Sequence, residues 1–100
     1  ANPRAKCKLG NTALNIAASN GRLEALEILV EQGLIDDPDV NGWTPLMSAA
    51  EKNHVTCLRA LLEDGANPSA KSTTGSTALF IAAANGRLEA IETLIEKGSK

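Results

Sequence analysis

The sequence predicts an all-α fold, a solenoid of three stacked helix-turn-helix units joined by finger-like loops. The segment Gly10–Leu14 recurs as Gly42–Leu46 and as Gly75–Leu79, at offsets of 32 and 33 residues. Each copy holds two short helical patterns separated by a Gly- or Asn-containing turn. Hydrophobic residues make up 43% of the chain but aromatic residues only 2%, so the core must consist of closely packed aliphatic side chains. A repeat of about 33 residues is typical of a solenoid.

The units follow one another within a single predicted domain, residues 1–100. Residues 1–9 read as the tail of a preceding unit's finger, and the units span 10–41, 42–74 and a truncated 75–100. The outer copies, Thr12–Gly33 and Thr77–Gly98, agree at 16 of 22 positions. The opening residues ANPRAK also return as ANPSAK at 66–71. We therefore expect either that the chain is a piece of a longer array or that it lacks dedicated capping units.

The first helix of each unit is predicted to begin at a Thr. Thr12 is a plausible N-cap, and Pro45 follows Thr44, where a proline fits the first helical turn. The small side chains of Ala17 and Ala18 allow the paired helix to approach closely. Gly and Asn tolerate the left-handed conformation of a helix end. The predicted turns are therefore Asn20-Gly21, Asn53-His54 and Asn85-Gly86.

The second helices are predicted at about 23–32, 55–64 and 88–97, each followed by a glycine at 33, 65 or 98. Leu23, Leu26 and Leu29 form a one-sided apolar stripe. Cys57 falls on the equivalent stripe of the middle unit and is predicted to be buried and inert. Because a unit cannot bury this face alone, its neighbours must cover it.

The middle unit carries the most complete copy of a recognisable sequence motif. Gly42–Ala50 reads GWTPLMSAA, and Gly65-Ala66-Asn67 follows its second helix. Over the whole chain these residues resemble the ankyrin-repeat family, whose units begin G-x-T-P-L-H-x-A-A. The family His is replaced by Asn15, Met47 and Phe80. We expect the hydrogen bonds of that His to be weakened or absent, and Met47 and Phe80 to pack rather than to contact a partner.

The first connecting loop is one residue shorter than the second, because its bounding glycines lie 9 positions apart (42 − 33) and those of the second lie 10 apart (75 − 65). We therefore expect residues 34–41 to form an irregular finger. This finger is acidic, through Asp36, Asp37 and Asp39, whereas residues 4–8 are basic. Such charges could steer a complementary partner, or they could belong to an ordinary mixed surface.

The resemblance implies a partner-binding surface made of the fingertips and the concave face of the first helices. Trp43 follows a turn glycine and is either an exposed hot spot or a side chain that packs over the neighbouring finger. His54 occupies a turn position at which we expect a structural hydrogen bond. The predicted binding residues are Lys8, Asn11, Ser19, Asn20, Asp37, Asp39, Asn41, Trp43, Glu51, Lys52, Thr73, Thr74, Ser76 and Asn85.

The predicted function is that of a non-catalytic scaffold that binds another protein or a peptide. One alternative is a methyl-lysine reader, because Trp43 and Glu51 match the aromatic and acidic cage of similar repeats. The remaining aromatic cage positions correspond to Ser48 and Ile81, so that cage is incomplete. A second alternative is an architectural spacer between other domains.

Several function classes are disfavoured. A single His, no nucleophile–base pair and no phosphate loop argue against an enzyme, a metal site, a cofactor or a small-molecule substrate. A net charge of −2 and the lack of an aromatic platform argue against nucleic acid. We find neither a membrane-spanning apolar run nor a signal pattern, and Cys7 and Cys57 suit free thiols. We therefore expect an intracellular location, cytoplasmic or nuclear.

Overall fold

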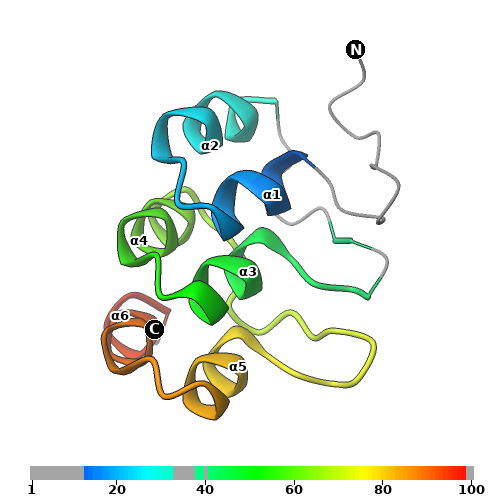
Figure 1. Ribbon diagram of the computed structural model, residues 1–100, viewed down its shortest axis with the longest axis vertical. Helices are drawn as coiled ribbons and strands as arrows, with labels where there is room; N and C mark the ends of the chain where they lie inside the picture. The colour runs from blue at the N-terminus through cyan, green and yellow to red at the C-terminus, as the bar shows by residue number, and fades with distance from the viewer. Residues whose placement is uncertain (1–12, 33–37, 40, 99–100) are drawn as a thin grey trace.

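The computed structural model describes residues 13–32, 38–39 and 41–98, and the regular structure there is entirely helical. Figure 1 shows two layers, with α1, α3 and α5 next to the loops and α2, α4 and α6 on the side away from the loops. This arrangement confirms the predicted all-α solenoid of helix-turn-helix units. The helices are α1 (Ala13–Ser19), α2 (Leu23–Val30), α3 (Pro45–Lys52), α4 (Val55–Glu63), α5 (Ala78–Ala84) and α6 (Leu88–Gly98).

Threonine side chains begin the first helices, as predicted. Thr44 Oγ1 accepts a hydrogen bond from the Met47 amide at 3.4 Å, and Thr77 Oγ1 accepts one from the Phe80 amide at 3.2 Å. Each bond satisfies one of the amides that a helix start leaves without an intrahelical partner. Pro45 lies in the first turn of α3. The expected cap at Thr12 lies outside the described residues.

The turns inside the units need a left-handed residue. Gly21, Asn53 and Gly86 have φ angles of 68°, 60° and 67°. The sequence prediction that Asn53 takes the glycine position of the middle unit is therefore confirmed. Asn53 fits less well than glycine, because its buried Oδ1 atom has no hydrogen-bond partner in the part of the chain that the structure describes.

The core lies between the two layers and continues from unit to unit. Leu14, Leu26, Leu46, Leu58 and Leu61 are essentially unexposed, and buried alanines fill the space between them. Along the array α1 packs on α3, α3 on α5, and α4 on α6. Burying one such leucine contributes roughly 1.5–3 kcal/mol, so the stacking of units is the main source of stability. Cys57 is also buried, as expected.

Hydrogen bonds to the helix ends repeat the same connection between units. His54 Nε2 donates to the Ser19 carbonyl oxygen at 3.0 Å, and Arg87 Nε donates to the Glu51 carbonyl oxygen at 2.9 Å. In both cases a side chain at the start of a second helix reaches the last turn of the first helix in the preceding unit. The structural role predicted for His54 is confirmed.

Two expectations about the replaced family His are wrong. Asn15 does not lose its contacts, because its Nδ2 donates to the Trp43 carbonyl oxygen at 2.8 Å and to Ser48 Oγ at 3.4 Å. Phe80 does not pack, since 62% of it is exposed. The next first helix covers Asn15 and Met47, whereas no described helix stacks beyond α5 to cover Phe80. The prediction that Met47 packs is confirmed by its burial.

The tip of the finger that leads into α3 has the same turn as the tip of the next finger, whereas most of the residues expected to make this finger irregular lie outside the described part of the chain. The Asp39 amide donates to the Trp43 carbonyl at 2.9 Å, and the Ser72 amide donates to the Ser76 carbonyl at the same distance. The two tips therefore form the same turn at an offset of 33 residues. Residues 33–37 and 40 lie outside the described part of the chain.

Candidate functional site

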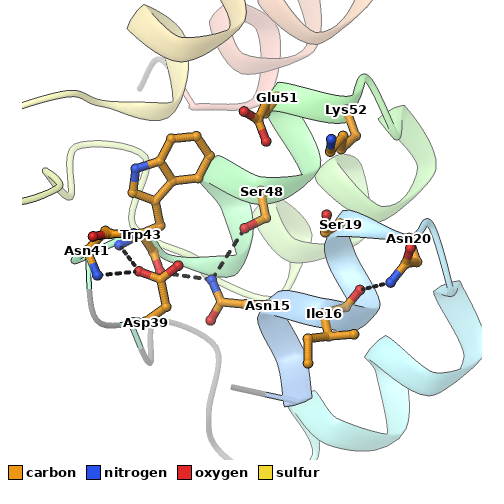
Figure 2. A pocket seen from close by; sticks show the side chains of 10 residues that line it. All are labelled: Asn15, Ile16, Ser19, Asn20, Asp39, Asn41, Trp43, Ser48, Glu51 and Lys52. Carbon is orange, nitrogen blue, oxygen red and sulfur yellow. Dashed lines mark hydrogen bonds between the residues drawn. The ribbon is translucent and has the colours of Figure 1, made fainter. Parts of the chain in front are cut away.

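A groove of about 400 Å³ lies between α1, α3 and the finger that leads into α3 (Figure 2). We call it the α1–α3 groove. It combines finger residues with residues of two successive first helices, which are the two surfaces expected to bind a partner. Its lining residues are Asn15, Ile16, Ser19, Asn20, Asp39, Asn41, Trp43, Ser48, Glu51 and Lys52.

Three hydrogen bonds fix the backbone of Trp43. Its amide donates to Asp39 Oδ1 at 3.0 Å, and its carbonyl accepts from the Asp39 amide at 2.9 Å and from Asn15 Nδ2 at 2.8 Å. The side chain is half-buried, packs against the core and also lines the groove. Trp43 can therefore pack against the core and still be available to a partner, because the packed indole remains accessible from the groove.

Asp39 shapes the fingertip. Its Oδ1 accepts from the Asn41 amide at 2.8 Å as well as from the Trp43 amide, which closes an Asx-type turn. The neighbouring finger supports this tip, because the Thr73 amide donates to the Asn41 carbonyl at 3.0 Å. The groove wall therefore rests on hydrogen bonds within and between fingers.

The other end of the groove is charged. Glu51 is half-buried and Lys52 is exposed, and both belong to the last turn of α3. Glu51 makes no ion pair with any residue that the structure describes. Asn20, whose Nδ2 donates to the Ile16 carbonyl at 2.9 Å, lies across the groove on the end of α1 (Figure 2).

The structure brings together half of the residues that the sequence singled out. Thr73, Thr74 and Ser76 belong to the next finger, and Asn85 lies in the turn after α5. Lys8, Asn11 and Asp37 lie outside the described residues. The predicted residues that line the groove are Ser19, Asn20, Asp39, Asn41, Trp43, Glu51 and Lys52.

Sequence reasoning missed Asn15, Ile16 and Ser48, which also line the groove. Helical spacing could have found them, because positions three or four apart share a helix face. Ser48 precedes Glu51 and Lys52 at these spacings, and Asn15 and Ile16 precede Ser19 and Asn20 in the same way.

The groove supplies amide, hydroxyl and carboxylate groups around one indole, which suits the binding of a polypeptide. The structure brings together only some of the positions that match a methyl-lysine cage in the sequence. Trp43, Ser48 and Glu51 share the groove, whereas Ile81 is buried in α5 and does not line it. Among the residues described, no group of three His, Cys, Asp or Glu could hold a metal ion. Their helices are also too short or too polar to cross a membrane.

Comparison with known proteins agrees with this architecture. The chain matches the family model described as ankyrin repeats, three copies, over residues 1–72, and a single-repeat model over residues 74–100. It is 39% identical over 92 residues to the B-cell lymphoma 3 protein homolog of Mus musculus, covering 90% of this chain and 20% of that protein. It is 37% identical over 92 residues to the human ankyrin repeat and KH domain-containing protein 1, covering 89% and 4%.

Across 83 residues the chain is 35% identical to the ankyrin repeat protein nuc-2 of Neurospora crassa, covering 80% of this chain and 8% of that protein. The chain thus spans a fifth or less of each of these relatives. What the similarity covers is the repeat array itself. With helical units at the predicted period and family models that match residues 1–72 and 74–100, the chain belongs to the ankyrin-repeat family.

Proposed function

We propose that the chain binds a segment of another protein in the α1–α3 groove, with the fingertips and the concave first-helix face acting together. A role in protein–protein interaction follows from the family; the site of binding is our proposal. One observation supports it above the others: the groove joins a half-buried Trp at a fingertip with polar side chains from two successive first helices. Rigid aromatic side chains of this kind are frequent anchors of protein interfaces.

Peptide selection combined with site-specific crosslinking tests this proposal. A library of random peptides is panned against the chain, and the selected peptides are crosslinked through a photoreactive residue at Asn41 or Lys52, both exposed groove positions. The matched control carries it at Glu92, which is exposed on α6 in the other helix layer. We expect crosslinks from the groove positions and few from Glu92.

Equal crosslinking from all three positions would count against the groove as the site. Panning that returns no binding peptide would favour the architectural spacer. The methyl-lysine reader is a second candidate, because Trp43 and Glu51 share the groove. Trp43 fluorescence measures it directly, and a trimethyl-lysine peptide that leaves this fluorescence unchanged would remove it.

A further inference from the structure

We infer that the α1–α3 groove recognises an arginine side chain of the partner, with the guanidinium stacked on the Trp43 indole and paired with the Glu51 carboxylate. This inference rests on the proposed function and specifies its ligand chemistry. It starts from the charges around the indole. Asp39 and Glu51 place two carboxylates at the groove, against the single ammonium of Lys52.

The repeat frame does not require either of the two central groups. Counting by the repeat offset, Trp43 corresponds to Asn11 and Ser76 in the other units. Glu51 corresponds in the same way to Ser19 and Ala84. The other units therefore form without an aromatic or an acidic side chain at these positions, so these groups of the middle unit are available for binding.

The position of Glu51 is locally unfavourable for a negative charge. It lies in the last turn of α3, where the helix dipole disfavours a carboxylate. It is half-buried and has no ion-pair partner among the described residues. Lys52 does not neutralise it, since no contact within 4.0 Å joins the two side chains, and the Arg87 guanidinium bonds the Glu51 carbonyl oxygen without forming an ion pair with its carboxylate. A bound cation would supply the missing partner.

The geometry favours guanidinium over other cations. Trp43 is the one aromatic residue among those that line the groove, so a methylated ammonium would find a single ring instead of a cage. A primary ammonium is strongly hydrated and presents no flat surface. Guanidinium is planar and weakly hydrated, so it can stack on one indole and donate two in-plane hydrogen bonds to a carboxylate.

A spectroscopic titration tests the inference without knowledge of the natural partner. The chain contains one Trp, so the indole N–H gives a single assignable NMR signal. The probes are acetyl-Gly-Arg-Gly-amide and the same tripeptide with citrulline, lysine or trimethyl-lysine. We expect the arginine probe to shift the Trp43 signal in the millimolar range, and citrulline, the neutral analogue of nearly equal shape, to bind about five-fold more weakly.

Two variants complete the test. Glu51→Gln should weaken arginine binding about five-fold and reduce the difference between arginine and citrulline, because the paired charge is gone. Glu96→Gln, on the exposed face of α6, is the matched control and should leave binding unchanged. Circular dichroism confirms that both variants fold.

Three results would overturn the inference: equal binding of arginine and citrulline, no effect of Glu51→Gln, or tighter binding of trimethyl-lysine than of arginine. If peptides selected by panning crosslink in the groove but carry no arginine preference, the proposed function stands and the arginine site fails. If arginine binds the groove but no longer peptide does, the arginine site stands and the proposed function fails.

Discussion

Gly42 connects the stability of the array with the shape of the groove. It lies between Asn41 and Trp43, has a φ angle of 75°, and a Cβ at this position would come within 2.9 Å of the Thr73 backbone nitrogen. That nitrogen donates the hydrogen bond to the Asn41 carbonyl that joins the two fingers. A methyl group at Gly42 should therefore strain the backbone and also separate the fingers.

Gly75 is the matched control for this substitution. It occupies the same turn one unit later, with a φ angle of 84°, but a Cβ there would meet no atom of the described residues beyond its chain neighbours within 4 Å. The amides of Gly42 and Gly75 donate equivalent turn bonds, at 3.0 Å to Asp39 and 2.9 Å to Ser72. The two glycines thus have the same turn geometry, and they differ in whether a neighbouring finger packs close to them.

The expected changes in the free energy of unfolding follow from these contacts. Gly75→Ala should lower the free energy of unfolding by about 1 kcal/mol, the cost of a left-handed L-residue. Gly42→Ala should lower it by the same amount plus about 1 kcal/mol for the inter-finger hydrogen bond and the displaced backbone, which is about 2 kcal/mol in total. In a domain of this size each kcal/mol corresponds to about 4–8 °C in Tm.

Urea unfolding followed by circular dichroism gives the two free energies, and hydrogen exchange of the Thr73 amide reports the inter-finger bond. Protection of that amide should fall in Gly42→Ala and persist in Gly75→Ala. If the two variants unfold within about 0.5 kcal/mol of each other, or if Thr73 keeps its protection in Gly42→Ala, the clash does not govern the finger geometry and the reasoning is refuted.

Three further predictions concern the helix units. Asn53→Gly should stabilise the chain by about 1 kcal/mol, because it removes an unpartnered buried Oδ1 from a left-handed position; an unchanged urea midpoint would contradict this. Asn15→Ala should cost about 1 kcal/mol and alter Trp43 fluorescence, and Asn15→His should restore both if a side-chain donor is what matters. Burial raises the pKa of the Cys57 thiol above its usual 9.0, and the charge of the nearby Glu27 makes a smaller contribution in the same direction. In a Cys7→Ser variant, which leaves Cys57 as the one thiol, a thiol reagent should therefore react about tenfold faster in urea than in buffer. Equal reaction rates in urea and in buffer would contradict the burial. Because the thiol ionises at a lower pH in the unfolded chain, the contribution of Cys57 to stability is complete below pH 9.0 and is lost as the pH rises through the folded pKa. Unfolding measured as a function of pH tests this.

The elements of the fold could be predicted from the sequence because each repeats a local signal. Helix starts follow from Thr44 and Thr77, and the turn at Asn53 follows from its alignment with glycines. These signals depend on backbone conformation within a few residues, which a repeat displays three times. Burial of Cys57 followed from helical spacing in the same way.

Contacts between units could not be predicted from local patterns. Asn15 replaces a larger histidine and was expected to lose its hydrogen bonds, yet its amide reaches the Trp43 carbonyl. Phe80 was expected to pack, although burial at this position depends on whether another unit stacks against its helix. Both outcomes depend on what the next first helix places against the position, which sequence periodicity within a unit does not give.

Different residues of the groove hold its shape and select its ligand. Its wall is held by bonds to the backbone of the finger, at the Trp43 and Asn41 carbonyls and the Trp43 amide. These bonds use backbone atoms of Trp43 and Asn41, so they do not depend on the side chains at these two positions, although one of them needs the Asp39 carboxylate. The Trp43 indole and the Glu51 carboxylate can then differ from the residues of neighbouring units without loss of the frame. It follows that a substitution at Glu51 should change which ligand binds, whereas one at Asn15 should change whether the groove persists.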